Sequence, residues 1–487
     1  METFGVVVIG AGPGGYPAAI RAAQLGATVA LVEREFLGGT CLNYGCIPSK
    51  ALIHTSDLYA QMRSSASLGL KGESVSFDYA AMAERKDQVV RGLRNGVKQL
   101  LAANGVKVFE GTASFENRKR IVVNSKSGNI AIGAEKTIIA TGATSSMPGF
   151  LPRHERVVES RAFLDLKSVP SRVLVLGGGV IGCEFACMLA QLGVQVTIVE
   201  ILEDVVAFLD ADIRRELRRQ MERTLSIRVL TGTSLENIKT DEHAARGAAG
   251  EEVLEADLLL AALGRKPVTQ ELQLENAGLK TNPQGFIEVD EYGTTQVSTI
   301  YAIGDVTGGP QLAHAATSQG LVAAENACTR RRRKNEKCIP YCIFTSPEAG
   351  AVGLTEQEAQ EQGREVTTGK FNFGALGKAQ AIGHPSGFVK WIADAKTEQL
   401  LGAQVIGVQA TDLIAEATTA IRSELTATEL AQTIHSHPTL AEAWMEAADV
   451  LLGEPIHTIA KRARFSSMRS FNVQEGGSHG YSGAPLF

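Results

Sequence analysis

The sequence predicts an α/β protein of several domains, in which two similar parallel sheets precede a smaller α+β domain. Three observations lead to this prediction. An apolar strand followed by a glycine-rich turn occurs near residue 10 and again near residue 177, and strands of a different texture begin near residue 339. A chain of 487 residues is also too long to be organised around one hydrophobic core.

The first motif joins a buried strand to a glycine-rich turn. Residues 6–9 are apolar at every position, and Gly10-Ala11-Gly12-Pro13-Gly14-Gly15 follows directly. A helical stretch comes next, and a second strand ends at Glu33. In such a unit the glycines let the backbone approach a pyrophosphate, and the acid binds a ribose hydroxyl. An ordinary tight turn would have no use for the acid. The candidate dinucleotide contacts are therefore Gly10, Gly12, Gly15 and Glu33.

The same arrangement recurs further along the chain with equal spacing, which predicts a second Rossmann-like dinucleotide-binding domain. A strand leads into Gly177-Gly178-Gly179-Val180-Ile181-Gly182, a helix follows, and the next strand ends at Glu200. A carboxylate at this position accepts the 2′-hydroxyl of NAD and repels the 2′-phosphate of NADP. No arginine directly follows Glu200, so we expect NAD. The candidate contacts are Gly177, Gly179, Gly182 and Glu200.

Two cysteines, Cys41 and Cys46, lie in a glycine-rich run shortly after the first motif. Their spacing alone is compatible with a structural disulfide, half of a metal site or a redox-active dithiol. Zinc would need a second pair, but Cys183 and Cys187 lie on a helix where buried, apolar-like thiols explain them better. A reducing compartment disfavours a structural disulfide. We therefore interpret the pair as a redox dithiol beside a flavin, with no metal site.

A histidine near the C-terminal end is a candidate general base. His437 precedes Pro438, which we expect in the first turn of a helix that carries Glu442. A histidine oriented by a carboxylate suits proton transfer near neutral pH, and the alternative is a structural histidine. His314 and His435 have no such partner nearby in sequence, and we interpret them as structural or as part of a pocket wall.

A possible charge pair joins two of these regions. Lys50 follows the cysteines, and Glu184 follows the second glycine motif. Paired with each other, they could tune the electron affinity of a flavin, whereas the alternative is two unrelated surface charges.

Composition narrows the remaining choices. A net charge of −5 argues against a nucleic-acid partner. Seven cysteines are sparse and odd in number, which suits a reducing compartment. We recognise neither a signal peptide nor an apolar run of membrane-spanning length. We expect a cytoplasmic protein with no membrane partner. The polar, Ser/Gly-rich residues 461–487 predict a disordered tail.

Together these motifs resemble the pyridine nucleotide-disulfide oxidoreductases. The resemblance rests on the two nucleotide motifs and on the residues 39–50, Thr141-Gly142, Gly304-Asp305 and His437-Pro438-Thr439. Leu42, Ile47-Pro48-Ser49-Lys50 and the Leu440 that precedes Glu442 make the chain most similar to the dihydrolipoyl dehydrogenase branch of that family. The resemblance extends from about residue 4 to about residue 460.

The resemblance implies the domain order and the cofactors. FAD would bind a domain formed by residues 1–145, and NAD a domain formed by residues 146–268. Residues 269–338 would return to the FAD-binding or central domain, and residues 339–460 would form an α+β dimerisation domain. Besides the motif residues above, the implied cofactor contacts are Gly39, Thr40, Lys50, Ala113, Thr141, Gly142, Glu184, Gly264, Asp305 and Ala313.

The resemblance also implies an active site shared by two subunits of a homodimer. Cys41 would be the thiol that exchanges with the substrate, and Cys46 the thiol next to the flavin. His437 of the partner subunit would take the proton of the incoming dithiol, with the partner's Glu442 orienting it.

The implied reaction oxidises a dihydrolipoyl group and reduces NAD. The substrate would be carried by a lipoyl-bearing protein of a 2-oxo acid dehydrogenase or glycine cleavage complex. One alternative is another NAD(P)H-dependent disulfide reductase of the same family. A second alternative is a redox-sensing flavoprotein subunit without turnover, which the complete set of two cysteines, histidine and glutamate argues against.

Overall fold

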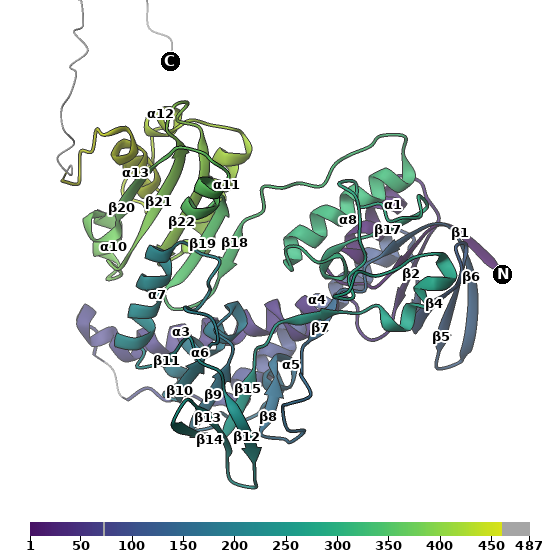
Figure 1. The fold of residues 1–487 in the computed structure, drawn as a ribbon, viewed down its shortest axis with the longest axis horizontal. Coiled ribbons are helices and arrows are strands. Elements are labelled where there is room, and N and C mark those ends of the chain that lie inside the picture. Colours follow the sequence, from purple (N-terminus) through teal and green to yellow (C-terminus); the bar gives the residue numbers. More distant parts are fainter. Residues whose placement is uncertain (72–73, 460–487) are drawn as a thin grey trace, which may run out of the picture.

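The computed structural model of the chain describes residues 1–71 and 74–459 (Figure 1). The expected disordered tail, residues 461–487, lies outside the described residues. Among the described helices, none combines the length and the apolar character needed to cross a membrane.

A seven-stranded sheet forms the centre of the first nucleotide-binding unit. Its order is β3-β2-β1-β6-β5-β4, and β17 pairs with β6. β1, β2, β3, β6 and β17 run parallel, whereas β4 and β5 form an antiparallel extension. Because β17 lies far along the chain, the chain returns to this sheet after building the second one. The strands are β1 (Glu2–Ile9), β2 (Val29–Glu33), β3 (Lys107–Glu110), β4 (Thr112–Asn117), β5 (Arg120–Ser125), β6 (Gly128–Ile139) and β17 (Ile300–Ala302).

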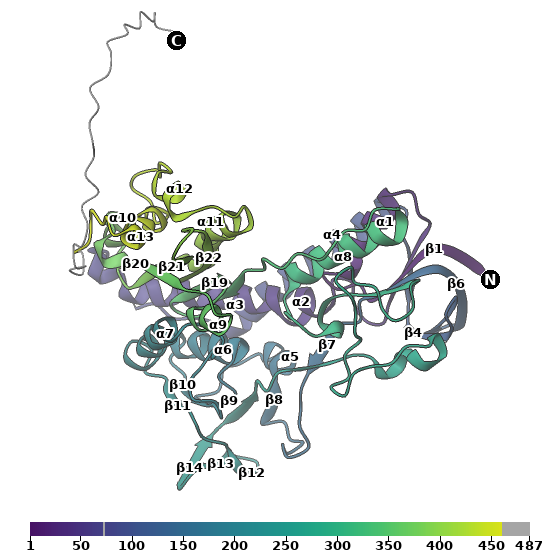
Figure 2. The same cartoon turned by 45° about the horizontal axis from the view of Figure 1, so that its top comes forward.

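The helices α1, α4 and α8 cover one face of the sheet, and α3 extends toward the other domains (Figure 2). α1 and α8 pack against each other beside it. The sequence expectation of a fully buried first strand is confirmed, since Val6, Val7 and Val8 are at most 1% exposed. The helices are α1 (Gly15–Gln24), α2 (Gly39–Tyr44), α3 (Cys46–Ser64), α4 (Tyr79–Ala103) and α8 (Ala313–Cys328).

A five-stranded, wholly parallel sheet forms the second nucleotide-binding unit. Its order is β11-β10-β9-β15-β8, and α6 packs against β10 and against α3 of the first unit. A short ribbon of β7 and β16 lies where the chain passes between the two units. The elements are β7 (Ala143–Ser145), β8 (Val157–Glu159), α5 (Ser160–Leu164), β9 (Arg172–Leu176), α6 (Val180–Gln191), β10 (Gln195–Val199), α7 (Ala211–Arg223), β11 (Arg228–Leu230), β15 (Leu258–Ala261) and β16 (Arg265–Pro267).

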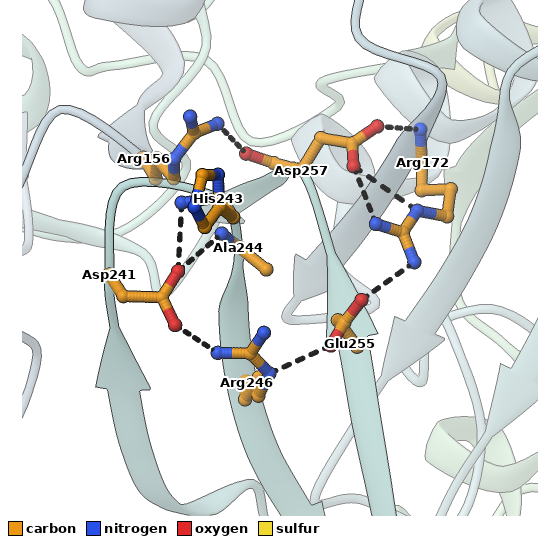
Figure 3. Close-up of polar contacts among 8 residues, drawn as sticks. All are labelled: Arg156, Arg172, Asp241, His243, Ala244, Arg246, Glu255 and Asp257. Carbon is orange, nitrogen blue, oxygen red and sulfur yellow. Dashed lines mark hydrogen bonds and ion pairs between the residues drawn. The ribbon is translucent and has the colours of Figure 1, made fainter.

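A small antiparallel sheet of β12 (Glu236–Thr240), β13 (Ala245–Ala249) and β14 (Glu252–Ala256) stands at the edge of this unit (Figure 1). A chain of alternating charges ties it to β9 (Figure 3). Arg172 binds Asp257 at 2.8 Å and Glu255 at 3.0 Å. Arg246 binds Glu255 at 2.7 Å and also pairs with Asp241. These ion pairs are largely exposed, so they orient the sheet more than they stabilise it.

The C-terminal domain is an antiparallel sheet of order β18-β19-β22-β21-β20, covered by helices. Its core contains both tryptophans of the chain, Trp391 and Trp444, each 0% exposed with ring centroids 4.6 Å apart. This is the α+β domain that the change of sequence texture predicted. The elements are β18 (Tyr341–Ile343), β19 (Glu348–Gly353), α9 (Glu356–Glu361), β20 (Val366–Asn372), α10 (Gly377–Ala381), β21 (Gly387–Asp394), β22 (Leu400–Gly407), α11 (Ala410–Arg422), α12 (Ala427–Ala431) and α13 (Glu442–Leu452).

A buried lysine on β21 connects the C-terminal domain to the second nucleotide-binding unit. The Lys390 side chain is 4% exposed, and its Nζ lies 2.8 Å from Asp210 and 3.2 Å from Asp212, beside the start of α7. It also pairs with Glu356 of α9. Burial alone lowers the pKa of Lys390, but these carboxylates outweigh it and raise the pKa above its ordinary value. The lysine therefore stays charged inside the domain junction.

One local sequence expectation was wrong. Pro438 does not occupy the first turn of a helix, because α13 begins at Glu442. The residues before α13 form a turn in which Thr439 Oγ1 donates to the carbonyl of Ser436 at 2.8 Å. The Glu442 carboxylate accepts the Thr439 amide at 2.7 Å, and the turn is held in this way without helical bonding.

Candidate active site

Cys41 and Cys46 form a disulfide at the junction of two helices. Cys41 is in α2, Cys46 is the first residue of α3, and their Cα atoms are 4.7 Å apart. The run that carries them is packed directly on the first glycine motif. The amide of Gly38 donates to the carbonyl of Ala11 at 2.8 Å, and a Cβ on Gly39 would lie 2.5 Å from the Cα of Gly12. Only glycine permits this close approach, and the φ of Gly39 is +58°.

A cavity of about 830 Å³ runs along the disulfide and between the two nucleotide-binding units. It brings together residues that sequence reasoning selected from distant parts of the chain. Both cysteines line it. The candidate cofactor contacts on its wall are Gly10, Gly12, Glu33, Gly39, Thr40, Lys50, Ala113, Thr141, Gly142, Gly179, Glu184, Gly264, Asp305 and Ala313.

The glycines of the first motif divide into two kinds. A Cβ on Gly10 would lie 2.3 Å from the carbonyl oxygen of Ala140, and one on Gly15 would lie 1.9 Å from that of Gly10. These two glycines permit close packing of strand and helix. Gly12 differs, because the nearest atom to its absent Cβ is 3.9 Å away and the position faces the cavity. A phosphate group fits at that opening, above the start of α1.

The second motif repeats this division. A Cβ on Gly177 would lie 2.5 Å from the carbonyl oxygen of Ala262, and one on Gly182 would lie 2.0 Å from that of Gly177. Gly179 has no atom within 4 Å of its absent Cβ, and it lines the cavity. Gly15, Gly177 and Gly182 therefore allow close packing within the two motifs and do not line the cavity. The residues present fit two dinucleotides, one at each motif.

The acids at the ends of β2 and β10 reach back to their own glycine motifs. Glu33 accepts the amide of Ala11 at 2.8 Å. Glu200, which is 9% exposed, accepts the amides of Gly178 at 2.5 Å and Leu202 at 2.8 Å. Each carboxylate is thus fixed beside the turn where the sequence pattern expected a ribose. Glu200 belongs to the second motif and does not line the large cavity.

Lys50 and Glu184 form a close ion pair next to the disulfide. Lys50 Nζ lies 2.8 Å and 3.0 Å from the two carboxylate oxygens, and the Glu184 side chain is 5% exposed. Glu184 also accepts the amide of Phe344 at 3.0 Å, and the ring of Phe344 lies under the ammonium group at 4.6 Å. The alternative of two unrelated surface charges is therefore wrong.

Asp305 lies at the cavity wall in the short helical turn after β17. Burial raises the pKa of its carboxyl, against the opposite effect of the guanidinium of Arg265, whose Nε is 3.6 Å away. Arg265 follows Gly264, so two cavity segments meet at this ion pair. Sequence reasoning selected Asp305 and Gly264 but not the arginine that links them.

His437 and Glu442 form the expected pair. His437 Nδ1 donates to Glu442 Oε1 at 2.8 Å, and the side chain of His437 is 76% exposed. Burial alone would raise the pKa of Glu442, but the Thr439 amide and His437 outweigh it and lower that pKa. The pair lies in the C-terminal domain, and neither residue lines the cavity that contains the disulfide of the same chain.

Two features of the site were not predicted. Arg161 of α5 stacks on the ring of Tyr44 at 3.7 Å and binds Glu35 at 2.5 Å, which fixes the outer face of the cysteine loop. No local signal marks Arg161, because its contacts are more than a hundred residues away. His435 was interpreted as structural because no partner lies near it in sequence, and its unpredicted partner is Glu416 of α11, to which Nε2 donates at 2.6 Å. His314, as expected, is at the cavity wall.

The other candidate cysteines are placed as small apolar residues. Cys183 and Cys187 are both buried on α6, and the thiol of Cys183 donates to the carbonyl of Gly178 at 3.3 Å. Burial raises the pKa of Cys187 to about 12. Neither residue lines the cavity that contains the Cys41–Cys46 disulfide.

Comparison with known proteins supports the family resemblance along nearly the whole chain. Residues 4–320 match the family model of the pyridine nucleotide-disulphide oxidoreductases, and residues 339–448 match the dimerisation domain of that family. Proteins named dihydrolipoyl dehydrogenase are 41% identical in Chlamydia muridarum and 43% identical in Haloferax volcanii. These matches cover 94% and 93% of this chain, and 98% and 97% of the relatives.

Solved structures agree as well. The HOCl-induced flavoprotein disulfide reductase RclA from Escherichia coli, solved as a Cu(II) complex, superposes with a TM-score of 0.85 at 30% identity, covering 93% of this chain and all of that one. LpdA from Mycobacterium tuberculosis superposes with a TM-score of 0.86 at 26% identity, covering 92% and 99%. This chain belongs to the pyridine nucleotide-disulphide oxidoreductases, enzymes that use a flavin and a pyridine nucleotide.

Proposed function

We propose that this protein is a homodimeric dihydrolipoyl dehydrogenase, which oxidises protein-bound dihydrolipoyl groups and reduces NAD. The observation that carries the proposal is a closed Cys41–Cys46 disulfide at the wall of a dinucleotide-sized cavity, together with an exposed His437 held by Glu442. The names of the relatives support the same substrate class. The carrier is a lipoyl-bearing protein of a 2-oxo acid dehydrogenase or glycine cleavage complex.

The reaction begins with exchange of a dithiol for a disulfide. A thiolate of the substrate attacks Cys41, the Cys41–Cys46 bond breaks, and the second substrate thiolate then displaces Cys41 to close the lipoyl ring. We assign Cys46 as the thiol on the flavin side of the pair. Gly12 and Glu33 would hold FAD, Gly179 and Glu200 would hold NAD, and the flavin would supply the electron-transfer chemistry between the reduced cysteines and NAD. The products are a lipoyl disulfide, NADH and one proton.

His437 supplies the base that generates the substrate thiolate. Its Nδ1–H is committed to Glu442, so Nε2 is the atom that accepts a proton. Nε2 makes no hydrogen bond within the described part of the chain, and the exposed ring leaves it accessible. Glu442 fixes the tautomer and stabilises the imidazolium that forms.

The active site is shared between two subunits. His437 and the disulfide of one chain belong to different domains and do not line a common cavity, so we assign His437 to the disulfide of the partner subunit. The match to a dimerisation domain supports this arrangement. Ile434, three residues before His437, is 96% exposed, and an apolar side chain this exposed beside the proposed base favours an interface.

NAD is the preferred electron acceptor. Glu200 is fixed beside the second glycine motif, where a 2′-phosphate would meet its charge. The residue that follows is Ile201, and Arg214 is paired with Asp204 at 3.6 Å. No arginine directly follows Glu200, where one would bind the phosphate of NADP.

Steady-state oxidation of free dihydrolipoamide tests the proposal. The wild-type enzyme is expected to use NAD strongly in preference to NADP, and His437→Gln is expected to lose dithiol oxidation severely. Reduction of an artificial one-electron acceptor by NADH does not need the base, so it serves as the control reaction for His437→Gln. Near-normal dihydrolipoamide oxidation in the variant would remove His437 from the mechanism, and no oxidation by the wild type would refute the function.

A further inference from the structure

One aromatic side chain in the segment that joins β10 to α7 is exposed at the wall of the large cavity. The residues around it, Val205, Val206 and Leu209, are at most 3% exposed. Phe208 is instead 44% exposed and lines the cavity. Its ring packs on that of Tyr341, the first residue of β18, with the ring centroids 5.2 Å apart, and Tyr341 lines the same cavity. The second nucleotide-binding unit and the C-terminal domain thus each contribute one ring to this wall.

The backbone around Phe208 is held on both sides. The amide of Val206 donates to the carbonyl of Gly178 in the second glycine motif at 2.9 Å. On the other side, the Asp210 carboxylate is bound by Lys390. Val206 has a φ of +41°, a left-handed conformation that a β-branched residue rarely adopts. Strained backbone of this kind is concentrated at functional sites, and among residues 201–210 it is Phe208 that lines the cavity.

The two rings connect the second glycine motif with the ion pair next to the disulfide. On one side, Phe208 belongs to the segment that is bonded to the motif, where Gly179 leaves an opening to the cavity. On the other side, Tyr341 is followed in the chain by Phe344, whose amide donates to Glu184 at 3.0 Å. A dinucleotide with its pyrophosphate at Gly179 would extend its nicotinamide half along this wall, toward Glu184.

We infer that Phe208 and Tyr341 form the surface on which the nicotinamide ring of the bound pyridine nucleotide stacks. The inference rests on the proposed binding of NAD at the second glycine motif. The nicotinamide of NAD⁺ is a planar ring with a positive charge, and the face of an aromatic side chain attracts such a cation. Leucine at position 208 would keep an apolar contact but remove this attraction. At a partly exposed ring the loss corresponds to a change in affinity of about two- to fivefold.

Calorimetric titration of the oxidised, FAD-loaded enzyme tests the inference without turnover. NAD⁺ carries the nicotinamide ring and ADP-ribose lacks it, while both carry the adenosine and the pyrophosphate. In Phe208→Leu the Kd for NAD⁺ should rise about two- to fivefold, and the Kd for ADP-ribose should not change. Phe208→Tyr keeps an aromatic face and should bind NAD⁺ as the wild type does. Phe150→Leu is the matched control, because Phe150 is 61% exposed and does not line the cavity, and it should leave both Kd values unchanged.

A second variant tests the other ring. Tyr341→Leu should also raise the Kd for NAD⁺ and leave the Kd for ADP-ribose unchanged, whereas Tyr341→Phe should bind NAD⁺ as the wild type does. The Tyr341 variants keep the test decisive where Phe208→Leu does not fold. Flavin absorbance per chain and tryptophan fluorescence show which variants retain FAD and the native fold.

The outcomes separate the two proposals. A wild type that does not oxidise dihydrolipoamide refutes the proposed function, while the comparison of NAD⁺ with ADP-ribose still tests the stacking surface. A wild type that binds NADP⁺ and not NAD⁺ refutes the NAD preference, and the same comparison is then made with NADP⁺ and 2′-phospho-ADP-ribose. An equal rise of both Kd values in Phe208→Leu would show that the ring only supports the fold and would overturn the inference. So would unchanged Kd values in both leucine variants.

Discussion

Replacing Lys390 with methionine should destabilise the junction between the C-terminal domain and the second nucleotide-binding unit. Methionine keeps the length of the side chain but removes the charge that three carboxylates surround. Asp210, whose side chain is 6% exposed, would then be a buried carboxylate without its cation. Removing one partner of a buried ion pair costs about 3–5 kcal/mol. Asp212 and Glu356 are 26% and 39% exposed and can turn to solvent, so the cost should lie near the lower end.

The two tryptophans provide the assay. Trp391 is the neighbour of Lys390 in β21, and its Nε1 donates to the carbonyl of Trp444 at 2.9 Å in the same core. Fluorescence during urea unfolding therefore reports on this domain, and the midpoint should fall by about 2 M. Lys396→Met is the matched control, because Lys396 is 80% exposed and 3.5 Å from Glu365; its midpoint should not change.

The loss should also depend on pH. The pKa of Lys390 is raised in the folded protein, so the stabilisation that the lysine provides is complete below its ordinary value and disappears as the pH rises through the folded value. Burial raises the pKa of Asp210, so in Lys390→Met protonation of Asp210 should recover part of the stability as the pH falls. Lys390→Met/Asp210→Asn should recover most of it at pH 7. A midpoint within about 0.5 M of wild type for Lys390→Met would refute the argument.

Two further predictions concern the site. Gly12→Ala should fold normally but lose FAD, because its Cβ enters the open cavity. Gly15→Ala should instead have a lower melting temperature, because its Cβ meets a carbonyl oxygen at 1.9 Å. Flavin absorbance per chain and thermal melting distinguish the two variants. An equal loss of FAD in both variants, with no change in melting temperature, would contradict this division of the glycines. Alkylation at pH 8 followed by mass spectrometry should leave Cys187 unlabelled, because burial raises its pKa to about 12, and should label Cys41 only after reduction by NADH. Labelling of Cys187 in the native protein would contradict its burial.

The parts of the fold and site that follow from local patterns could be predicted, and the parts that depend on distant contacts could not. Gly10 and Glu33 belong to one strand–turn–helix–strand unit, so the spacing of the motif predicts that they lie close together. The partner of His435 is Glu416, which comes from another helix, and nothing near His435 in the sequence indicates it. Likewise, nothing near Tyr44 in the sequence indicates that Arg161 lies over its ring.

Turn geometry was the other limit. The sequence does not distinguish a proline in the first turn of a helix from a proline in the turn that precedes the helix. Pro438 lies in the preceding turn, because α13 begins only at Glu442. The His437–Glu442 contact is present all the same, with Nδ1 of His437 2.8 Å from Glu442 Oε1.

Because Gly39 packs directly on Gly12, the cysteine loop and the glycine turn form one structural unit. A designer who moved the disulfide into another nucleotide-binding scaffold would have to transplant both loops, since a side chain on Gly39 would meet the Cα of Gly12 at 2.5 Å. Shuffling between related chains should succeed with breakpoints outside residues 10–46 and fail within them. A side chain at position 39 is acceptable only if the backbone at Gly12 moves away.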